Sequence, residues 1–282
     1  MASVGDALGA AVDGLRAAGV EDPRLDAEVL LAEAVGCNRA ALIADGGAEV
    51  TPAAARAFGE MVRRRLRREP VAYIVGRKGF RNIELEVDSR VLIPRPETEL
   101  LVEVGLEREP ATLLDLGTGS GAIALAAADE LPGCAVSAAD TSPAALEVAR
   151  ANADRLGLAE RVRFLSGSLP EGESFDLVLA NLPYVAERDW PSLQPEVTKW
   201  EPREALLAGP DGLDAYRALL ADCCRLLVRY PHQRTTAKMG LAVEVGEGQA
   251  PEVAELMEQA GFSTIAARRD LAGIERVVIG ER

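Results

Sequence analysis

The chain of 282 residues is 48% apolar, so it can bury a sizeable core and is expected to form one large or two unequal domains. Its net charge of −14, from 31 basic and 45 acidic residues, argues against broad binding to nucleic acid or to an anionic membrane surface. Four cysteines and one histidine show no metal-ligand spacing, so no metal is expected. With no secretory signal and no membrane-spanning run expected, the sequence indicates a reduced, cytoplasmic protein.

The first seventy residues predict a small bundle of four or five helices, because apolar residues recur there at three-to-four spacing. Asp22-Pro23 and Thr51-Pro52 are typical helix starts, with a capping residue before a proline in the first turn. The arginine-rich stretch Arg63–Arg68 ends the last helix, where we expect a solvated face, with contact to an acidic partner as the alternative. The predicted helices are residues 4–18, 23–35, 40–44 and 52–68.

Residues 70–99 have a different texture. Val71–Gly76 and Ile83–Val87 look like the two strands of a hairpin, the second alternating between apolar and polar residues. Pro94 and Pro96 make the next segment stiff, and a helix is expected from Glu97 or Thr98 to about residue 107. These changes divide the chain into a helical part at 1–69, a hairpin and proline-rich linker at 70–96, and a third part at 97–282.

The third part opens with a strand at Thr112–Leu116, a glycine loop at Gly117–Gly121 and a helix at Ala122–Glu130. This order is typical of the first nucleotide-binding unit of a doubly wound fold, where glycines let the backbone approach a ligand. No Lys-Ser/Thr pair follows the last glycine, which disfavours a phosphate-gripping P-loop. A second strand, Val136–Ala139, ends at Asp140, about twenty residues on, where an acid can bind both hydroxyls of a ribose.

A buried strand, Leu177–Ala180, stops abruptly at Asn181. Pro183 cannot donate to a sheet ladder, so the chain must leave the sheet here and Asn181 sits at the carboxyl end of a strand. With its acceptor and two donors, Asn181 can grip a planar amide or amino group beside the ring of Tyr184. The alternative is a turn in which the asparagine caps local backbone.

The alternation of strands and helices continues to residue 279. The last two strands are separated by a short segment with a glycine, so they must run antiparallel. The polar segment Arg229–Gly240 is expected to be a surface loop with an exposed His232. The predicted helices are 143–156, 212–228 and 251–260, and the predicted strands are 162–165, 175–180, 241–245, 262–267 and 276–279.

These motifs resemble the HemK/PrmC methyltransferases, which methylate the glutamine side-chain amide in the Gly-Gly-Gln motif of class-1 peptide release factors. The resemblance runs from about residue 23 to the C-terminus, and L-I-P-R-P-E-T-E at 92–99 is its most diagnostic part. It implies an α/β fold: a Rossmann-like class I S-adenosylmethionine-dependent methyltransferase domain at 97–282, and a helical substrate-docking domain at 1–69. The other matching segments are P-V-A-Y-I at 70–74, D-L-G-T-G-S-G at 115–121, the Asn181 motif, E-P-x-x-A-L at 201–206, D-G-L at 211–213 and D-L-A-G at 270–273.

The same resemblance implies a role for each matching site residue. Asp140 would bind the cofactor ribose and Leu169 would pack on its adenine. Asn181 and the Pro183 carbonyl would accept hydrogen bonds from the substrate amide, and Tyr184 would pack beside it. The implied cofactor-binding residues are Gly117, Thr118, Gly119, Ser120, Gly121, Asp140, Leu169 and Asn181; the implied catalytic residues are Asn181, Pro183 and Tyr184, which Leu182 joins in the substrate site.

The sequence departs from the family pattern at two places. Position 182 is Leu where family members usually carry Pro, and Asn-Leu-Pro-Tyr is more familiar in methyltransferases acting on adenine amino groups. Ser168 stands where the family often has an acid, so its hydrogen bond to the adenine amino group is in doubt. We expect the same amide chemistry, with two acceptors orienting the NH2 group and no general base.

Three other functions compete with this prediction. An adenine-amino-directed RNA or DNA methyltransferase would share the cofactor residues and Asn181, but the −14 charge argues against it. A nicotinamide-dependent oxidoreductase would leave Asn181–Tyr184 unexplained, and a non-catalytic binding module predicts a broken glycine loop. The expected partner is therefore a class-1 release factor, with no nucleic acid or membrane, and a monomer is expected.

Overall fold

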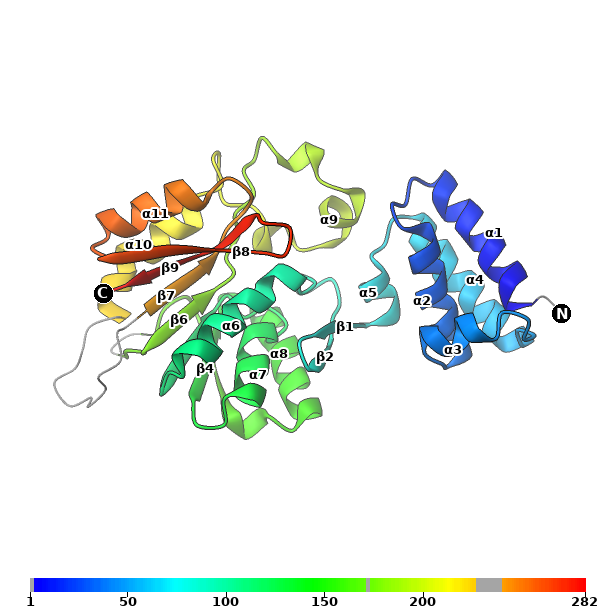
Figure 1. Ribbon diagram of the computed structural model, residues 1–282, viewed down its shortest axis with the longest axis horizontal. Helices are drawn as coiled ribbons and strands as arrows, with labels where there is room; N and C mark the ends of the chain where they lie inside the picture. Colours follow the sequence, from blue (N-terminus) through cyan, green and yellow to red (C-terminus); the bar gives the residue numbers. More distant parts are fainter. Residues whose placement is uncertain (1–2, 171–172, 227–239) are drawn as a thin grey trace. The chain divides into compact units, whose positions relative to one another are not determined.

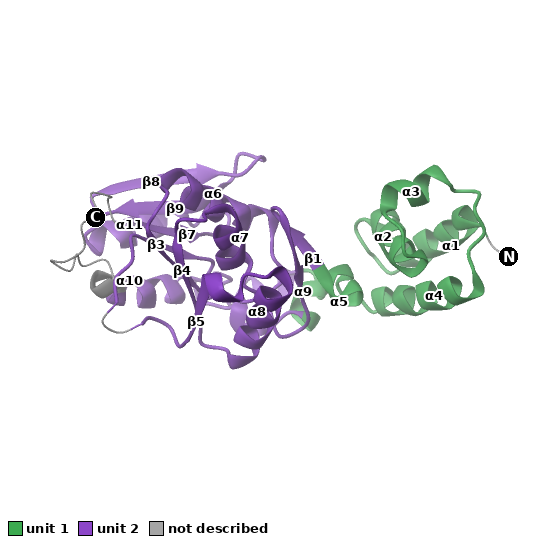
Figure 2. Ribbon diagram, turned by 90° about the horizontal axis from the view of Figure 1, so that it is seen from below, with its two compact units in different colours: residues 1–77, 194–200 green, residues 78–193, 201–282 purple. Residues whose placement is uncertain are grey.

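The computed structural model describes residues 3–170, 173–226 and 240–282, and the chain divides into two compact units (Figures 1 and 2). Unit 1 comprises residues 1–77 and 194–200, and unit 2 comprises residues 78–193 and 201–282. The boundary falls inside the linker predicted at 70–96. The membership of residues 194–200 in unit 1 was not predicted at all, because those residues lie far along the chain from the other helices of that unit.

Unit 1 is a helical bundle, as the apolar spacing predicted. Leu15, Leu30 and Leu31 are fully buried in its core, together with the nearly buried Phe58. The hydroxyl of Thr51 accepts a hydrogen bond from the Ala54 amide and so caps its helix as expected, whereas Asp22 makes no side-chain cap. The helices of unit 1 are α1 (Val4–Ala17), α2 (Pro23–Val35), α3 (Arg39–Ala44), α4 (Pro52–Leu66), α5 (Val71–Val75) and α9 (Pro195–Trp200).

The prediction of a strand at residues 71–76 is wrong, because this segment is the helix α5. The Pro70 carbonyl accepts hydrogen bonds from the amides of Tyr73 and Ile74, which starts a helical turn, and both side chains are buried. Burial of one helical face therefore overrides the strand propensity of a run rich in β-branched residues. The two-stranded sheet consists instead of β1 (Arg77–Phe80) and β2 (Ile83–Glu86).

The arginines that end α4 are divided between the surface and the interior of unit 1. Arg65 is buried and binds both Asp26 of α2, at 2.6 Å, and Glu196 of α9, at 2.7 Å. Arg68 binds Glu196 from the other side at 2.6 Å. The expected solvated face therefore holds for the exposed Arg63, but Arg65 and Arg68 attach the distant segment 194–200 to the bundle.

Unit 2 is built on a seven-stranded sheet with the strand order β5-β4-β3-β6-β7-β9-β8. The first five of these strands in spatial order are parallel, whereas β9 runs antiparallel to both of its neighbours. The order reverses between β3 and β6, and ligands of such sheets bind outside the carboxyl ends of the strands at this switch point. The strands are β3 (Thr112–Leu116), β4 (Ala135–Asp140), β5 (Val162–Ser166), β6 (Leu177–Ala180), β7 (Gly240–Glu244), β8 (Thr264–Arg269) and β9 (Glu275–Glu281).

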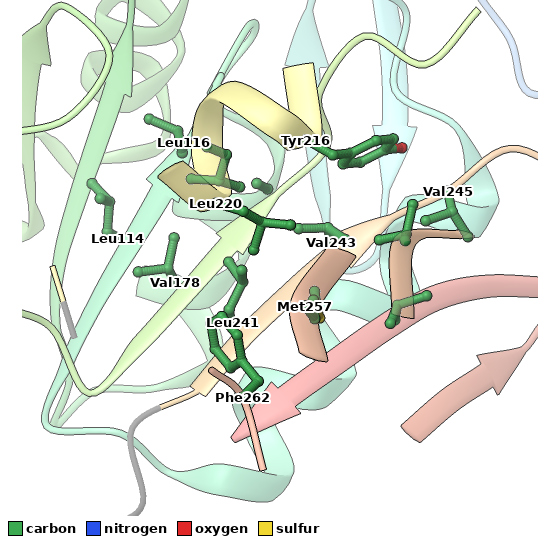
Figure 3. Close-up of a cluster of buried hydrophobic side chains, with 14 of the residues drawn as sticks. Leu114, Leu116, Val178, Tyr216, Leu220, Leu241, Val243, Val245, Met257 and Phe262 are labelled. Atoms are coloured by element: carbon green, nitrogen blue, oxygen red, sulfur yellow. The ribbon is translucent and has the colours of Figure 1, made fainter. Parts of the chain in front are cut away.

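Helices cover both faces of this sheet (Figure 1). On one face, Tyr216 and Leu220 of α10 and Met257 of α11 pack against strand residues such as Val178 and Leu241 (Figure 3). The helices are α6 (Glu99–Arg108), α7 (Ala122–Glu130), α8 (Pro143–Leu156), α10 (Asp214–Leu226) and α11 (Ala250–Gln259), with one-turn 3-10 helices at Pro96–Thr98, Ala159–Arg161, Trp190–Ser192 and Arg203–Ala205.

Two further expectations concern the loop at residues 229–240 and membrane-spanning helices. The predicted surface loop at 229–240, with His232, lies outside the described residues except for residue 240, which begins β7. Among the described helices, none combines the length and the apolar character that a membrane crossing requires.

Candidate active site

The glycine loop and the Asn181 motif meet at the switch point of the sheet. Leu116, the last residue of β3, pairs with Ala180, the last residue of β6, so Gly117 and Asn181 leave neighbouring strands at the same edge. Gly117 has a φ of +75°, and a Cβ placed on it would lie 3.3 Å from the Leu182 Cδ2 atom. The glycine is therefore required both for its left-handed backbone and for the close approach of the two loops.

Asp115 holds the glycine loop from beneath. Its Oδ2 atom accepts hydrogen bonds from the Thr118 hydroxyl, at 2.6 Å, and from the Ala124 amide at the start of α7, at 3.0 Å. The side chain is fully buried, and burial raises the pKa of its carboxyl to about 7. Asp115 thus fixes the loop to the helix, but it does not line the cavity that lies at the carboxyl edge of the sheet.

Asp140 ends β4 and faces the cleft, as the sequence predicted. Its Oδ2 atom accepts a hydrogen bond from the Gly119 amide at 2.9 Å, and its Oδ1 atom accepts one from the Ser142 amide at 2.8 Å. Each carboxylate oxygen can accept more than one hydrogen bond, so the group retains capacity for the hydroxyls of a ligand. Asp140 is therefore held rigidly by the loop that it adjoins.

Residues of the glycine loop, Asp140 and the Asn181 motif line a cleft of about 320 Å³ at the carboxyl edge of the sheet. Of the residues singled out from the sequence, Gly117, Thr118, Ser120, Asp140, Leu169, Asn181, Leu182 and Pro183 line this cleft. Gly119, Gly121 and Tyr184 do not line it, although the Gly119 amide binds Asp140. The structure thus brings most of the implied cofactor and substrate residues together in one cavity.

Asn181 is oriented by a residue that sequence reasoning did not select. Its Nδ2 atom donates a hydrogen bond to the Thr98 hydroxyl at 3.0 Å, and both residues line the cleft. Because Nδ2 is engaged by Thr98, the Oδ1 atom is left as the acceptor of this side chain. This arrangement suits a ligand that carries an NH2 group.

Tyr184 lies beside the cleft and not in its wall. Its carbonyl accepts a hydrogen bond from the Gln249 side chain at 3.0 Å, and its ring packs against the hydrophobic core. Burial, reinforced by the nearby Glu244, raises the pKa of the Tyr184 phenol well above its usual range. The ring is therefore neutral at physiological pH and supports the loop that carries Pro183.

The structure adds cleft residues from three segments that the sequence had left without a role in the site. They come from the proline-rich segment, from the turn after Pro202 and from α10. Arg95 of the proline-rich segment pairs with Glu201, whose Oε2 atom also accepts the Ile93 amide at 3.1 Å. The sequence motifs at 92–99 and 201–206 were the signal from which some of these cleft residues could have been found. The added residues include Leu92, Pro94, Thr98, Glu204, Ala205, Leu219 and Asp222.

Comparison with known proteins identifies the family. A model of the PrmC N-terminal domain matches residues 6–76, and a model of a methyltransferase domain matches residues 113–200. A release factor glutamine methyltransferase of Caulobacter vibrioides is 41% identical, covering 96% of this chain and 93% of its own. Another, from Moorella thermoacetica, is 43% identical and covers 98% and 97%. The chain belongs to the release factor glutamine methyltransferase family.

The structural likeness of this methyltransferase to solved proteins concerns the fold alone. A methyltransferase from Pyrococcus furiosus has a TM-score of 0.52 at 18% identity, covering 72% of this chain and 91% of that chain. Together with the parallel sheet and its antiparallel last strand, this likeness confirms the predicted Rossmann-like methyltransferase fold.

The cleft of this methyltransferase fits S-adenosylmethionine, the cofactor of its class. Gly117, Thr118 and Ser120 of the glycine loop line it, and Gly117 has no side chain to cover the backbone from a ligand. Asp140 offers a carboxylate for ribose hydroxyls, and Leu169 and Ile123 offer apolar surface for a base. Ser168 also lines the cleft, so the position at which the family often has an acid lies in the same cavity.

Proposed function

We propose that this protein transfers a methyl group from S-adenosylmethionine to the side-chain amide nitrogen of the glutamine in the Gly-Gly-Gln motif of class-1 peptide release factors. The observation that carries the proposal is the orientation of Asn181, whose Nδ2 atom is bound to Thr98 while Oδ1 is left to accept from an NH2 group. Membership of the release factor glutamine methyltransferase family supports the choice of substrate.

The cofactor is held by residues of the glycine loop and of the strand ends beside it. The glycine loop Gly117–Gly121, of which Gly117, Thr118 and Ser120 line the cleft, would hold the methionine end, Asp140 would bind the ribose hydroxyls, and Leu169 would pack on the adenine. When bound, S-adenosylmethionine supplies a methyl group on a positively charged sulfur, which is an electrophile.

Asn181 and Pro183 act on the nucleophile. An amide nitrogen is a poor nucleophile because its lone pair is conjugated with the carbonyl. The Oδ1 atom of Asn181 and the backbone carbonyl of Pro183 accept the two hydrogens of the NH2 group, which aims the nitrogen and favours the positive charge that develops on it. The proton can leave after transfer, so no side chain is assigned as general base. Leu182 and Tyr184 hold the loop around the amide.

We assign substrate docking to the helical part at 1–69, joined through the linker at 70–96 to the catalytic part at 97–282. A protein substrate needs a contact surface beyond a single glutamine side chain, and a family model of the PrmC N-terminal domain covers residues 6–76. We propose that the protein works as a monomer in the cytoplasm, where release factors serve the ribosome.

Methyl transfer from labelled S-adenosylmethionine to a purified class-1 release factor tests the proposal. We expect label on the intact factor and none on a factor whose motif glutamine is changed to alanine. Asn181→Ala should lower kcat by roughly 100-fold or more, because it removes an acceptor that acts in the transition state. Asn82→Ala, in the exposed turn between β1 and β2, is the matched control and should leave kcat unchanged.

Ribosomal RNA assayed in parallel decides between the two amino-group substrates. The sequence Asn181-Leu182-Pro183-Tyr184 is compatible with adenine as well as with glutamine. Label on RNA with none on the release factor would replace the glutamine assignment by the adenine-directed one.

A further inference from the structure

The orientation of the Asn181 amide is not determined by Thr98 alone. A hydroxyl can donate one hydrogen bond and can also accept, so it can pair with either end of an asparagine amide. An amide turned the other way would place Oδ1 on Thr98 and present Nδ2 to the substrate. Something beyond Thr98 must therefore decide which end of Asn181 faces a ligand.

Glu244 can determine which end of the Asn181 amide faces a ligand. It ends β7, the strand next to β6, and only 2% of its surface is exposed. The Thr98 hydroxyl lies beside the Glu244 carboxyl and, as a hydrogen-bonding neighbour, lowers its pKa, while the Oε2 atom has no hydrogen-bond partner among the described residues. An ionised carboxylate can only accept. It therefore takes the single hydrogen of Thr98 and leaves the Thr98 oxygen to accept from Asn181.

We propose that Glu244 and Thr98 are positioning residues, which hold the Asn181 amide with Oδ1 toward the substrate through the chain Asn181 Nδ2–H to Thr98 Oγ1–H to Glu244. The inference deepens the proposed function and rests on it. The two residues do not touch the substrate nitrogen. They act by making one of the two amide orientations of Asn181 the stable one.

This arrangement depends on the charge of Glu244. A neutral carboxyl can itself donate to Thr98, whose hydrogen is then free for Asn181 Oδ1, and the preference for the productive orientation is lost. Burial is the largest influence on this group and raises its pKa to about 7, against the Thr98 hydrogen bond, which lowers it. The titratable and charged groups around Glu244 are Glu97 of the 3-10 helix, Arg95 of the proline-rich segment, Arg276 of β9, Tyr184 of the Asn181 loop and Tyr216 of α10.

A purely structural role for Glu244 would require Glu244→Gln to lower the stability of the protein, whereas the burial of this carboxyl predicts no such loss at pH 8. Because its pKa in the folded chain lies above the ordinary value of 4.5, the folded state favours the neutral form. The associated stability is present below about pH 4.5 and is lost as pH rises to about 7. Glu244→Gln should therefore melt at the same or a higher temperature than the unmodified protein at pH 8, even though it loses activity.

The test combines kinetics on the release factor with a titration that does not depend on activity. Thr98→Val should lower kcat about tenfold, the worth of one lost hydrogen bond, with KM and the cofactor Kd unchanged, and Thr98→Ser should restore kcat. In the unmodified enzyme kcat should fall as the pH drops below about 7, because Glu244 becomes neutral. This fall should be absent in Glu244→Gln. Thr264→Val, on the exposed edge strand β8, is the matched control.

The titration of Glu244, followed by carbon NMR of its carboxyl, gives the independent readout. Thr98→Val removes a hydrogen bond that lowers this pKa, so the Glu244 pKa should rise in that variant. An unchanged titration, or full kcat in both Thr98→Val and Glu244→Gln, overturns the proposal. If the unmodified enzyme labels no release factor, the substrate assignment fails instead, and the titration still decides the hydrogen-bond chain.

Discussion

Asp115 and Asp140 come from the neighbouring strands β3 and β4, yet their carboxylates have different surroundings. Asp115 is fully buried and binds the glycine loop and the start of α7, whereas Asp140 is half-buried and reaches the cleft. One acid therefore fixes the loop and the other is available to a ligand. The two carboxylates should respond differently to substitution.

Replacing Asp140 should weaken cofactor binding. Asp140→Ala removes a charged acceptor that faces the cleft, and a hydrogen bond to a charged group contributes about 1.5–3 kcal/mol, which corresponds to a loss of roughly 10- to 100-fold in affinity. Calorimetry with S-adenosylhomocysteine measures this loss directly. Asp154→Asn, an exposed acid on α8, is the control; equal affinities in all three proteins would contradict the assignment.

Replacing Asp115 should change how stability depends on pH. The pKa of its carboxyl in the folded chain is about 7, above the ordinary 3.8, so the folded state favours the neutral acid. The stability it contributes is present below about pH 3.8 and is lost as pH rises to about 7. The melting temperature of Asp115→Asn minus that of the unmodified protein should therefore be larger at pH 8 than at pH 5. A difference in melting temperature that is independent of pH would count against the buried, neutral carboxyl.

The elements that the sequence predicted best are those whose signals are local. The bounds of α2, α7 and α8 agree with the prediction to the residue, because each begins at a proline or a glycine turn and carries continuous apolar spacing. The strand expected at 71–76 failed because burial against the rest of unit 1 outweighed local propensity. Such burial depends on residues distant in sequence, which no local pattern reports.

The same distinction applies to the cleft. Gly117, Asp140 and Asn181 could be selected because each follows a strand at the carboxyl edge of a parallel sheet. Thr98 could not, since its contact with Asn181 joins positions 83 residues apart. For Glu244, likewise, the sequence predicted only that it belongs to a strand. Side-chain partners brought together by the sheet remain invisible until the strand order is known.

At the scale of elements, α4 and α9 are joined by charge. Arg65→Met should lower the stability of unit 1 by about 3 kcal/mol or more, because it leaves Asp26 and Glu196 without a shared buried partner. Denaturant unfolding of the full chain, followed by helix content, measures this change. Arg63→Met, which removes only an exposed pair with Glu60, should lie within about 0.5 kcal/mol of the unmodified protein. Equal losses in the two variants would refute the distinction.

At the scale of the whole molecule, the chain passes between the two units three times. It crosses after residue 77, again after residue 193 and again after residue 200. The helical unit is therefore completed by seven residues that follow the Asn181 motif, and Glu196 among them carries two ion pairs. A single cut in the linker does not remove every tie between the units.

A protease site inserted between residues 77 and 78 of the full chain tests this connection. After cleavage we expect the two fragments to elute together from a sizing column, because α9 of the larger fragment stays within the bundle of the smaller one. Adding Glu196→Gln should let them separate at lower salt than without it. Fragments that part at once, with Glu196 intact, would contradict the expectation.

Residues 194–200 also set a condition on how this chain can be taken apart and rebuilt. A construction that exchanges the helical part for that of another protein must exchange this heptapeptide as well, or Arg65 and Arg68 lose their common carboxylate. The helical unit is therefore not a detachable N-terminal module, because it consists of two separate stretches of the sequence and the second stretch interrupts unit 2.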